Sequence, residues 1–126
     1  MRGSTPLGKV LGYGSAKDGA GHWWVQRVTA VALVPLTIWF VLSLASLPLA
    51  DHAAVTAWMR QSLHAVPLSV LILTLCWHAR LGVQVVLEDY VHHHAIKVTS
   101  LLLSTFLHAL LASTGVFAVL RIAFAV

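Results

Sequence analysis

Long apolar stretches separated by short polar segments are the main pattern along this chain. Three runs contain no Asp, Glu, Lys or Arg: residues 28–50, 61–79 and 98–120. An α-helix needs about 20 mostly apolar residues to cross the roughly 30 Å hydrocarbon core of a bilayer. The pattern therefore predicts an all-α membrane protein. Its three transmembrane helices are expected near residues 27–49, 65–88 and 96–122.

The segments outside these helices are polar or rich in glycine. Residues 1–22 hold most of the glycines and no apolar stretch of the length found in a signal peptide. We expect them to form a flexible tail on the inner face, followed by a three-helix membrane anchor over residues 23–126. Between the first two helices, residues 51–64 are expected to form a short interfacial helix, with Trp58 at the level of the lipid headgroups. Pro35 falls inside the first helix and predicts a kink there.

Composition agrees with a lipid environment. Apolar residues make up 59% of the chain and charged residues 10%, whereas a soluble domain carries about a quarter charged residues. A soluble protein of this size could not hide so much apolar surface, because small proteins leave a large share of their surface exposed. The single cysteine, Cys76, excludes a disulfide framework within the chain.

Basic residues indicate how the chain crosses the membrane. The N-terminal tail is basic, and Arg27 follows at the membrane entry. Because positively charged segments stay on the cytoplasmic side, we expect the N-terminus and residues 88–97 inside, and residues 50–64 and the C-terminus outside. The net charge of +4 then requires no nucleic acid, since the basic residues form no patch and no nucleic-acid-binding motif is present.

Two of the eight histidines, His78 and His108, lie deep inside apolar runs. Ionisable residues inside a membrane are costly and often mark functional sites, although a neutral imidazole can also simply link two helices by a hydrogen bond. His78 lies ten residues from Glu88 and His108 eleven from Lys97, which puts both at a depth of about 15 to 16 Å. Equal depth leaves open a self-contained cytochrome b, with one haem held by both histidines. A structural membrane subunit without a cofactor also remains open.

The helix around His78 has a face suited to a flat ligand. Residues 78, 82, 85 and 89 share that face. Gly82 lies one turn from the imidazole and has no side chain to block a porphyrin lying edge-on between helices. Tyr90 lies about 18 Å further along the helix, near the inner membrane surface.

Two stretches of the chain resemble a known family. Residues 77–92 read WHARLGVQVVLEDYVH and resemble the second helix of the small hydrophobic membrane-anchor subunit of succinate dehydrogenase (complex II). Residues 21–36 read GHWWVQRVTAVALVPL and look like the entry to the first helix of that subunit in bacteria of the mitochondrial lineage. With the three-helix pattern, the resemblance covers roughly residues 20–122. It implies a multi-pass protein of the bacterial inner membrane rather than the mitochondrial one.

The resemblance implies a haem b site. His78 would be an axial ligand of the haem iron, with the second axial histidine supplied by a companion cytochrome b-type anchor subunit. Arg27 would lie near the haem propionates, and Gly82 and His22 would belong to the haem pocket. His108 would then be a residue that hydrogen-bonds between helices.

The resemblance also implies a ubiquinone site at the inner membrane surface. Tyr90 would donate a hydrogen bond to a quinone carbonyl, and Asp89 would support the polar network or deliver protons. Trp23 is a plausible neighbour. From the residues alone, Tyr90 and Trp23 could equally belong to the aromatic belt of a membrane protein, and Arg27 could be a topology anchor only.

The implied assembly is larger than this chain. A flavoprotein subunit and an iron–sulfur subunit would dock on the inner face, and electrons would pass from succinate to quinone in the tricarboxylic acid cycle and respiratory chain. This chain would carry no succinate-oxidising chemistry itself, and its residues do not distinguish succinate oxidation from fumarate reduction. The tract His92–His94 is expected to be a solvated loop rather than a metal site, because consecutive residues point in different directions.

Overall fold

The computed structural model describes the backbone of residues 16–124 and the side chains of residues 20–124. The described part contains four α-helices: α2 (Ala16–Ala45), α3 (His52–Arg60), α4 (Ser62–Tyr90) and α5 (His94–Ala123). Three segments are long and apolar enough to cross a membrane: Ala20–Ala45 in α2, Ser62–Tyr90 and His94–Ala123. The prediction of an all-α membrane protein with three spanning helices is confirmed.

The helix ends differ from those expected from the charge runs. Helix α2 begins at Ala16 and ends at Ala45, so it takes in the last residues of the segment 1–22 that we expected to be a flexible tail. A helix can continue beyond the hydrocarbon core into polar sequence. A run without charged residues therefore identifies the part of the helix inside the membrane but not its extension outside. The rest of that segment, residues 1–15, lies outside the described residues.

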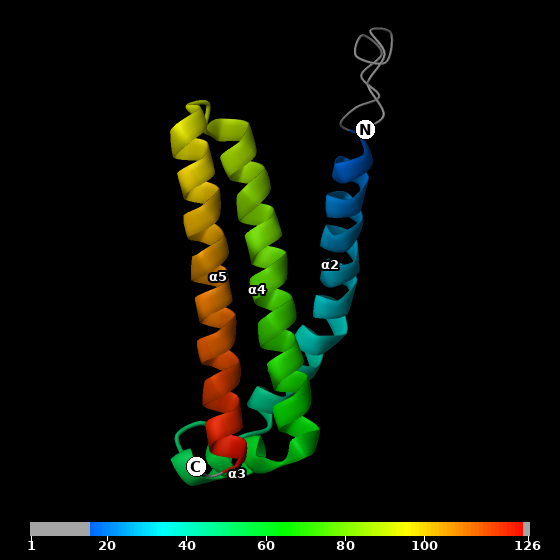
Figure 1. The fold of residues 1–126 in the computed structure, drawn as a ribbon. Helices are drawn as coiled ribbons and strands as arrows, with labels where there is room; N and C mark the ends of the chain where they lie inside the picture. The colour runs from blue at the N-terminus through cyan, green and yellow to red at the C-terminus, as the bar shows by residue number, and fades with distance from the viewer. Residues whose placement is uncertain (1–15, 125–126) are drawn as a thin grey trace, which may run out of the picture.

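Helix α4 is the central element of the fold. It lies between α2 and α5, and it packs against both of them (Figure 1). The N-terminal end of α2 and the turn between α4 and α5 are at one end of the molecule, and α3 and the C-terminus are at the other. This arrangement agrees with three crossings and with the N-terminal end of α2 and the α4–α5 turn on the same side of the membrane.

Helices α4 and α5 run antiparallel in a register that two side-chain contacts define. Arg80 Nε donates to Thr105 Oγ1 over 3.2 Å, and Lys97 Nζ donates to the carbonyl of Glu88 over 2.9 Å. His78 lies two residues before Arg80 on α4, and His108 lies three residues after Thr105 on α5. In antiparallel helices the two histidines therefore lie at about the same level. This register agrees with the equal depth inferred from the sequence.

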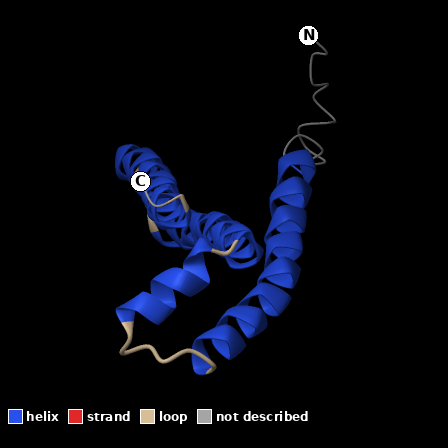
Figure 2. Ribbon diagram, turned by 90° about the horizontal axis from the view of Figure 1, so that it is seen from below, coloured by secondary structure: helices blue, strands red, loops and turns tan. Residues whose placement is uncertain are grey.

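Helix α3 lies across the end of the long helices. Figure 2 shows it along its length while α4 and α5 are seen nearly end-on, which is the orientation expected of an interfacial helix. Asp51 caps its N-terminus, since Asp51 Oδ1 accepts hydrogen bonds from the backbone N–H groups of Ala53 and Ala54. Trp58, expected at headgroup level, is instead half-buried and stacks on His64 with ring centroids 4.6 Å apart.

The small core lies at the α3 end of the molecule. Its buried members are Ala65, Leu68, Leu71 and Val119. Helix α2 passes through Pro35 without a break and curves along its length (Figure 2). Most other large apolar side chains are exposed, for example Phe106 at 71%. Exposed apolar surface on this scale needs lipid or other chains to cover it.

Candidate functional site

A row of polar side chains follows the contact between α2 and α4. His22, Gln26 and Thr29 are spaced by four and three residues, which places them on one face of α2. His78 and Gly82 face them from α4. A Cβ atom added to Gly82 would lie 3.9 Å from Gln26 Nε2. We call these five residues the α2–α4 polar seam.

The seam contains a hydrogen bond between the two helices. Thr29 Oγ1 lies 2.9 Å from His78 Nδ1. Thr29 Oγ1 also lies 2.9 Å from the carbonyl oxygen of Val25 and 3.0 Å from that of Gln26. His78 is therefore held to α2 through one nitrogen of its ring.

Two polar atoms of the seam are enclosed and have no hydrogen-bond partner within residues 20–124: His22 Nε2 and Gln26 Oε1. Burying such an atom unpaired costs on the order of 1–3 kcal/mol, so each marks a place where a polar group from outside the chain would be favourable. Neither pairs with the other, although they lie one turn apart.

The second ring nitrogen of His78, Nε2, has no hydrogen-bond partner among residues 20–124 and is not fully enclosed by them. A neutral imidazole with one nitrogen fixed by a hydrogen bond and the other free is the usual state of a histidine metal ligand. The atom nearest to a Cβ added at Gly82 is Gln26 Nε2, at ordinary contact distance. These residues fit an axially ligated haem.

His108 has a different environment from His78. Its Nδ1 atom lies 2.7 Å from the carbonyl oxygen of Ser104, one turn back on the same helix. Among residues 20–124, the hydrogen bond of His108 therefore stays within its own helix, whereas His78 bonds to a residue of another helix. A carbonyl one turn back is within reach without any second helix, which is why the local bond forms.

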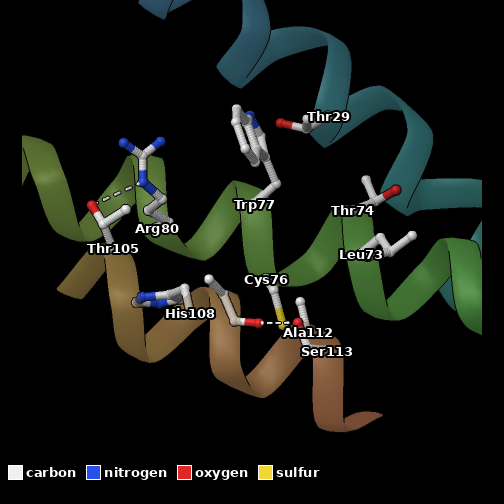
Figure 3. A pocket seen from close by; sticks show the side chains of 11 residues that line it. Thr29, Leu73, Thr74, Cys76, Trp77, Arg80, Thr105, His108, Ala112 and Ser113 are labelled. Atoms are coloured by element: carbon white, nitrogen blue, oxygen red, sulfur yellow. Dashed lines mark hydrogen bonds between the residues drawn. The ribbon is translucent and has the colours of Figure 1, made fainter. Parts of the chain in front are cut away.

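A cavity of about 510 Å³ lies between α4 and α5 and reaches Thr29 on α2. Its polar lining includes Arg80, Thr105 and His108. Figure 3 shows Trp77 extending from α4 toward α2, Arg80 bonded to Thr105, and His108 on α5. His78 does not line this cavity. The two histidines are thus level with each other, but only His108 lines this cavity.

Arg27 and Trp23 lie on the exposed surface of α2 rather than in the seam. The guanidinium of Arg27 lies 5.5 Å from the ring centroid of Trp23, and both residues are exposed. The structure does not bring Arg27 to His78. A contact between Arg27 and a propionate would therefore have to form on the outer side of α2.

Tyr90 and Asp89 lie at the C-terminal end of α4, at the same end of the molecule as the start of α2. Tyr90 is 78% exposed, and Asp89 is also exposed. Among residues 20–124, no hydrogen bond or ring contact joins either of them to Trp23. The three predicted quinone residues share an end of the chain but do not form an enclosed pocket on their own.

The histidine tract lies at the α4–α5 turn, on the surface of this chain. His92, His93 and His94 are all exposed. No group of three His, Cys, Asp or Glu side chains placed to hold a metal ion occurs among the described residues. Arg80 is half-buried, and its guanidinium lies 5.3 Å from the ring centroid of Trp77.

The sequence analysis missed Gln26 and Thr29. Their signal was present, since together with His22 they repeat every three to four residues within an apolar span. A helix places such residues on one face. What the sequence does not contain is the rotation of α2 relative to α4, which decides that this face meets His78.

The chain was compared with known proteins. Residues 1–123 match the family model described as "Succinate dehydrogenase/Fumarate reductase transmembrane subunit". A succinate dehydrogenase hydrophobic membrane anchor subunit of Rickettsia bellii is 33% identical over 91 residues, covering 72% of this chain and 73% of that protein. The corresponding subunit of Rickettsia conorii is 30% identical over 75% of this chain and 76% of its own length. A succinate dehydrogenase membrane anchor subunit of Reclinomonas americana is 28% identical, covering 75% and 82%. No solved structure matches.

Proposed function

This chain belongs to the succinate dehydrogenase/fumarate reductase transmembrane subunit family and is a membrane anchor of complex II, and from that premise we propose that it supplies one axial ligand to haem b and part of the ubiquinone site. It is a multi-pass membrane protein associated with the other subunits of succinate dehydrogenase. We place it in a bacterial inner membrane with the N-terminal end of α2 on the cytoplasmic side. The partners are a flavoprotein, an iron–sulfur subunit and a cytochrome b-type second anchor.

The observation that carries the haem proposal is the state of His78. One ring nitrogen is held by Thr29 at 2.9 Å, and the other has no partner among residues 20–124 and is not fully enclosed by them. A ligand nitrogen that faces outward suits a haem shared with another subunit. A haem b bound there supplies a one-electron carrier within the membrane.

The remaining seam residues have supporting roles in this proposal. Gly82 would add no side chain to the face of α4 that carries His78. His22 Nε2 and Gln26 Oε1, both enclosed and unpaired within the described residues, would find partners in bound water or a polar group of the assembled site. Arg27 is exposed on α2, where its permanent charge suits a propionate.

Quinone reduction takes two electrons and two protons and gives the quinol. Tyr90 would donate a hydrogen bond to a quinone carbonyl oxygen, and Asp89 would support proton delivery from the aqueous phase. Both lie at the exposed end of α4, and a second chain would close the pocket over them and over Trp23. The chain itself would hold the quinone and the haem, and the soluble subunits would oxidise succinate.

A second candidate is a self-contained cytochrome b with His78 and His108 on one iron. Their equal depth favours it. Against it, His108 lines the α4–α5 cavity and His78 does not, while His78 is bonded toward α2. Two ligands of one iron must face the same space, so we keep His78 as the single ligand from this chain.

A reduced-minus-oxidised visible spectrum of the purified complex tests the ligand assignment. His78→Ala should abolish the haem b band, because the imidazole is the iron ligand. His108→Ala is the matched control, since it removes an imidazole at the same depth, and it should retain the band. Loss of the band in both variants would instead favour the self-contained cytochrome. Absence of haem from the wild-type complex would overturn the proposal.

A further inference from the structure

We propose that Thr29 is a positioning residue for the haem ligand: its hydroxyl accepts the Nδ1 proton of His78, fixes the imidazole tautomer and directs Nε2 to the iron. This rests on the proposed ligation by His78. The residue lies on α2, one helix away from the ligand, and acts through the imidazole alone.

The hydrogen-bond network assigns the protons. The Thr29 hydroxyl has one proton and three acceptors within reach, the carbonyls of Val25 and Gln26 and the ring nitrogen of His78. If the hydroxyl donated its proton to His78 Nδ1, no hydrogen would lie between Thr29 Oγ1 and the two carbonyl oxygens, which are 2.9 and 3.0 Å away. If His78 Nδ1 carries the proton and donates, Thr29 can donate to the backbone of its own helix. A threonine inside a helix commonly does so.

The assigned tautomer leaves a lone pair on His78 Nε2. That atom has no hydrogen bond and is not enclosed by the described residues. A proton on Nδ1 excludes the other neutral tautomer, in which Nε2 would carry the hydrogen and could not bind iron. Thr29 thus favours the ligating form of the ring before any haem is bound.

The same hydrogen bond affects the metal as well as the ring. A hydrogen-bond acceptor at the ring nitrogen that does not bind the metal makes the imidazole a more basic ligand. Loss of such an acceptor typically costs about 10- to 100-fold in metal affinity. A more basic ligand favours the ferric state. Removing the Thr29 hydroxyl should therefore weaken haem retention and raise the haem reduction potential.

The variants are chosen to separate the hydroxyl from the bulk of the side chain. Thr29→Val keeps the shape and removes the hydroxyl, Thr29→Ala removes both, and Thr29→Ser keeps the hydroxyl. Thr114→Val is the matched control. Thr114 also bonds to its own helix backbone, at 2.8 Å to Leu110 O, but it is exposed and contacts no imidazole.

Two measurements are made on the purified complex: the rate of haem transfer to excess apomyoglobin, and the haem reduction potential by potentiometric titration. Thr29→Val and Thr29→Ala should lose haem about 10- to 100-fold faster than the wild type and show a higher potential. Thr29→Ser and Thr114→Val should match the wild type. Should one of the first two variants fail to assemble, the other gives the same readout.

The outcomes separate this inference from the haem proposal itself. Wild-type haem loss and potential in Thr29→Val and Thr29→Ala, with haem still absent from His78→Ala, would overturn the role of Thr29 and leave His78 as the ligand. Retention of haem in His78→Ala would overturn the ligand assignment and this inference with it. Equal effects of Thr29→Ser and Thr29→Val would also overturn it, because the serine hydroxyl can accept the same proton.

Discussion

His78 and His108 have the same side chain at about the same depth but different surroundings. His78 Nδ1 meets Thr29 of another helix at 2.9 Å, and His108 Nδ1 meets the carbonyl of Ser104 on its own helix at 2.7 Å. In both rings Nε2 has no hydrogen bond to any of residues 20–124. What separates them is the space that each ring faces, and this gives His78 rather than His108 the role of haem ligand in our account.

Single residues are also where the sequence was least informative. The motif around His78 singled out the ligand that we propose, and His22 was already expected in the haem pocket. Thr29 was not, because a threonine in an apolar helix is common and bonds to its own backbone. Its role depends on which face of α2 meets α4, which depends on the packing of two helices whose contact residues are far apart in sequence.

At the residue scale, Tyr90→Phe tests the quinone role. Loss of one hydrogen bond of about 0.5–1.5 kcal/mol should weaken quinone binding and reduction roughly 2- to 10-fold. Succinate oxidation with an artificial dye should be unchanged, because the dye takes electrons before the membrane site. Trp24→Phe is the control, since Trp24 is an exposed aromatic residue at the same end of the molecule. Unchanged quinone turnover in Tyr90→Phe would count against the assignment.

At the scale of the helices, the sequence predicted which elements exist better than where they end. The charge-free runs identified all three spans, because a charged side chain at any position within a span is costly to bury in lipid. The same signal missed the extension of α2 to Ala16. The sequence also did not contain the ring contacts of Trp58, which lies where α2, α3 and α4 meet: it stacks on Trp39 of α2 at 5.8 Å and on His64 of α4 at 4.6 Å.

Close packing of α4 and α5 depends on a glycine. A Cβ atom added to Gly115 would lie 2.9 Å from Ile72 Cγ2, closer than real side-chain contacts allow. Ile72 is branched at Cβ, so this methyl group cannot move without moving the whole side chain. Small residues at helix contacts have this function in many membrane proteins.

Gly115→Ala should therefore destabilise the contact by about 1–3 kcal/mol, seen as a lower thermal unfolding midpoint of the purified complex in detergent. Gly21→Ala is the control. Gly21 is also a helical glycine, but nothing lies within 4 Å of an added Cβ atom, so the better helix propensity of alanine should leave the midpoint equal or higher. A midpoint for Gly115→Ala at or above that of Gly21→Ala would contradict the packing.

At the scale of the whole molecule, the three helices form an incomplete unit. The core is small and lies at the α3 end, and the large apolar side chains along α2, α4 and α5 are mostly exposed. The free nitrogen of His78 and the exposed quinone residues face outward in the same way. A membrane anchor that shares its haem and its quinone with a second anchor subunit accounts for all of these features together.

The most direct test of the account replaces the ligand rather than removing it. His78→Met should give the purified complex a haem with one histidine and one methionine ligand, with a higher reduction potential and an altered low-spin electron paramagnetic resonance spectrum. His108→Met should keep the bis-histidine spectrum and the wild-type potential. A His78→Met complex that retains the bis-histidine spectrum, or a His108→Met complex that loses it, would contradict the claim that this chain gives haem b one ligand, His78.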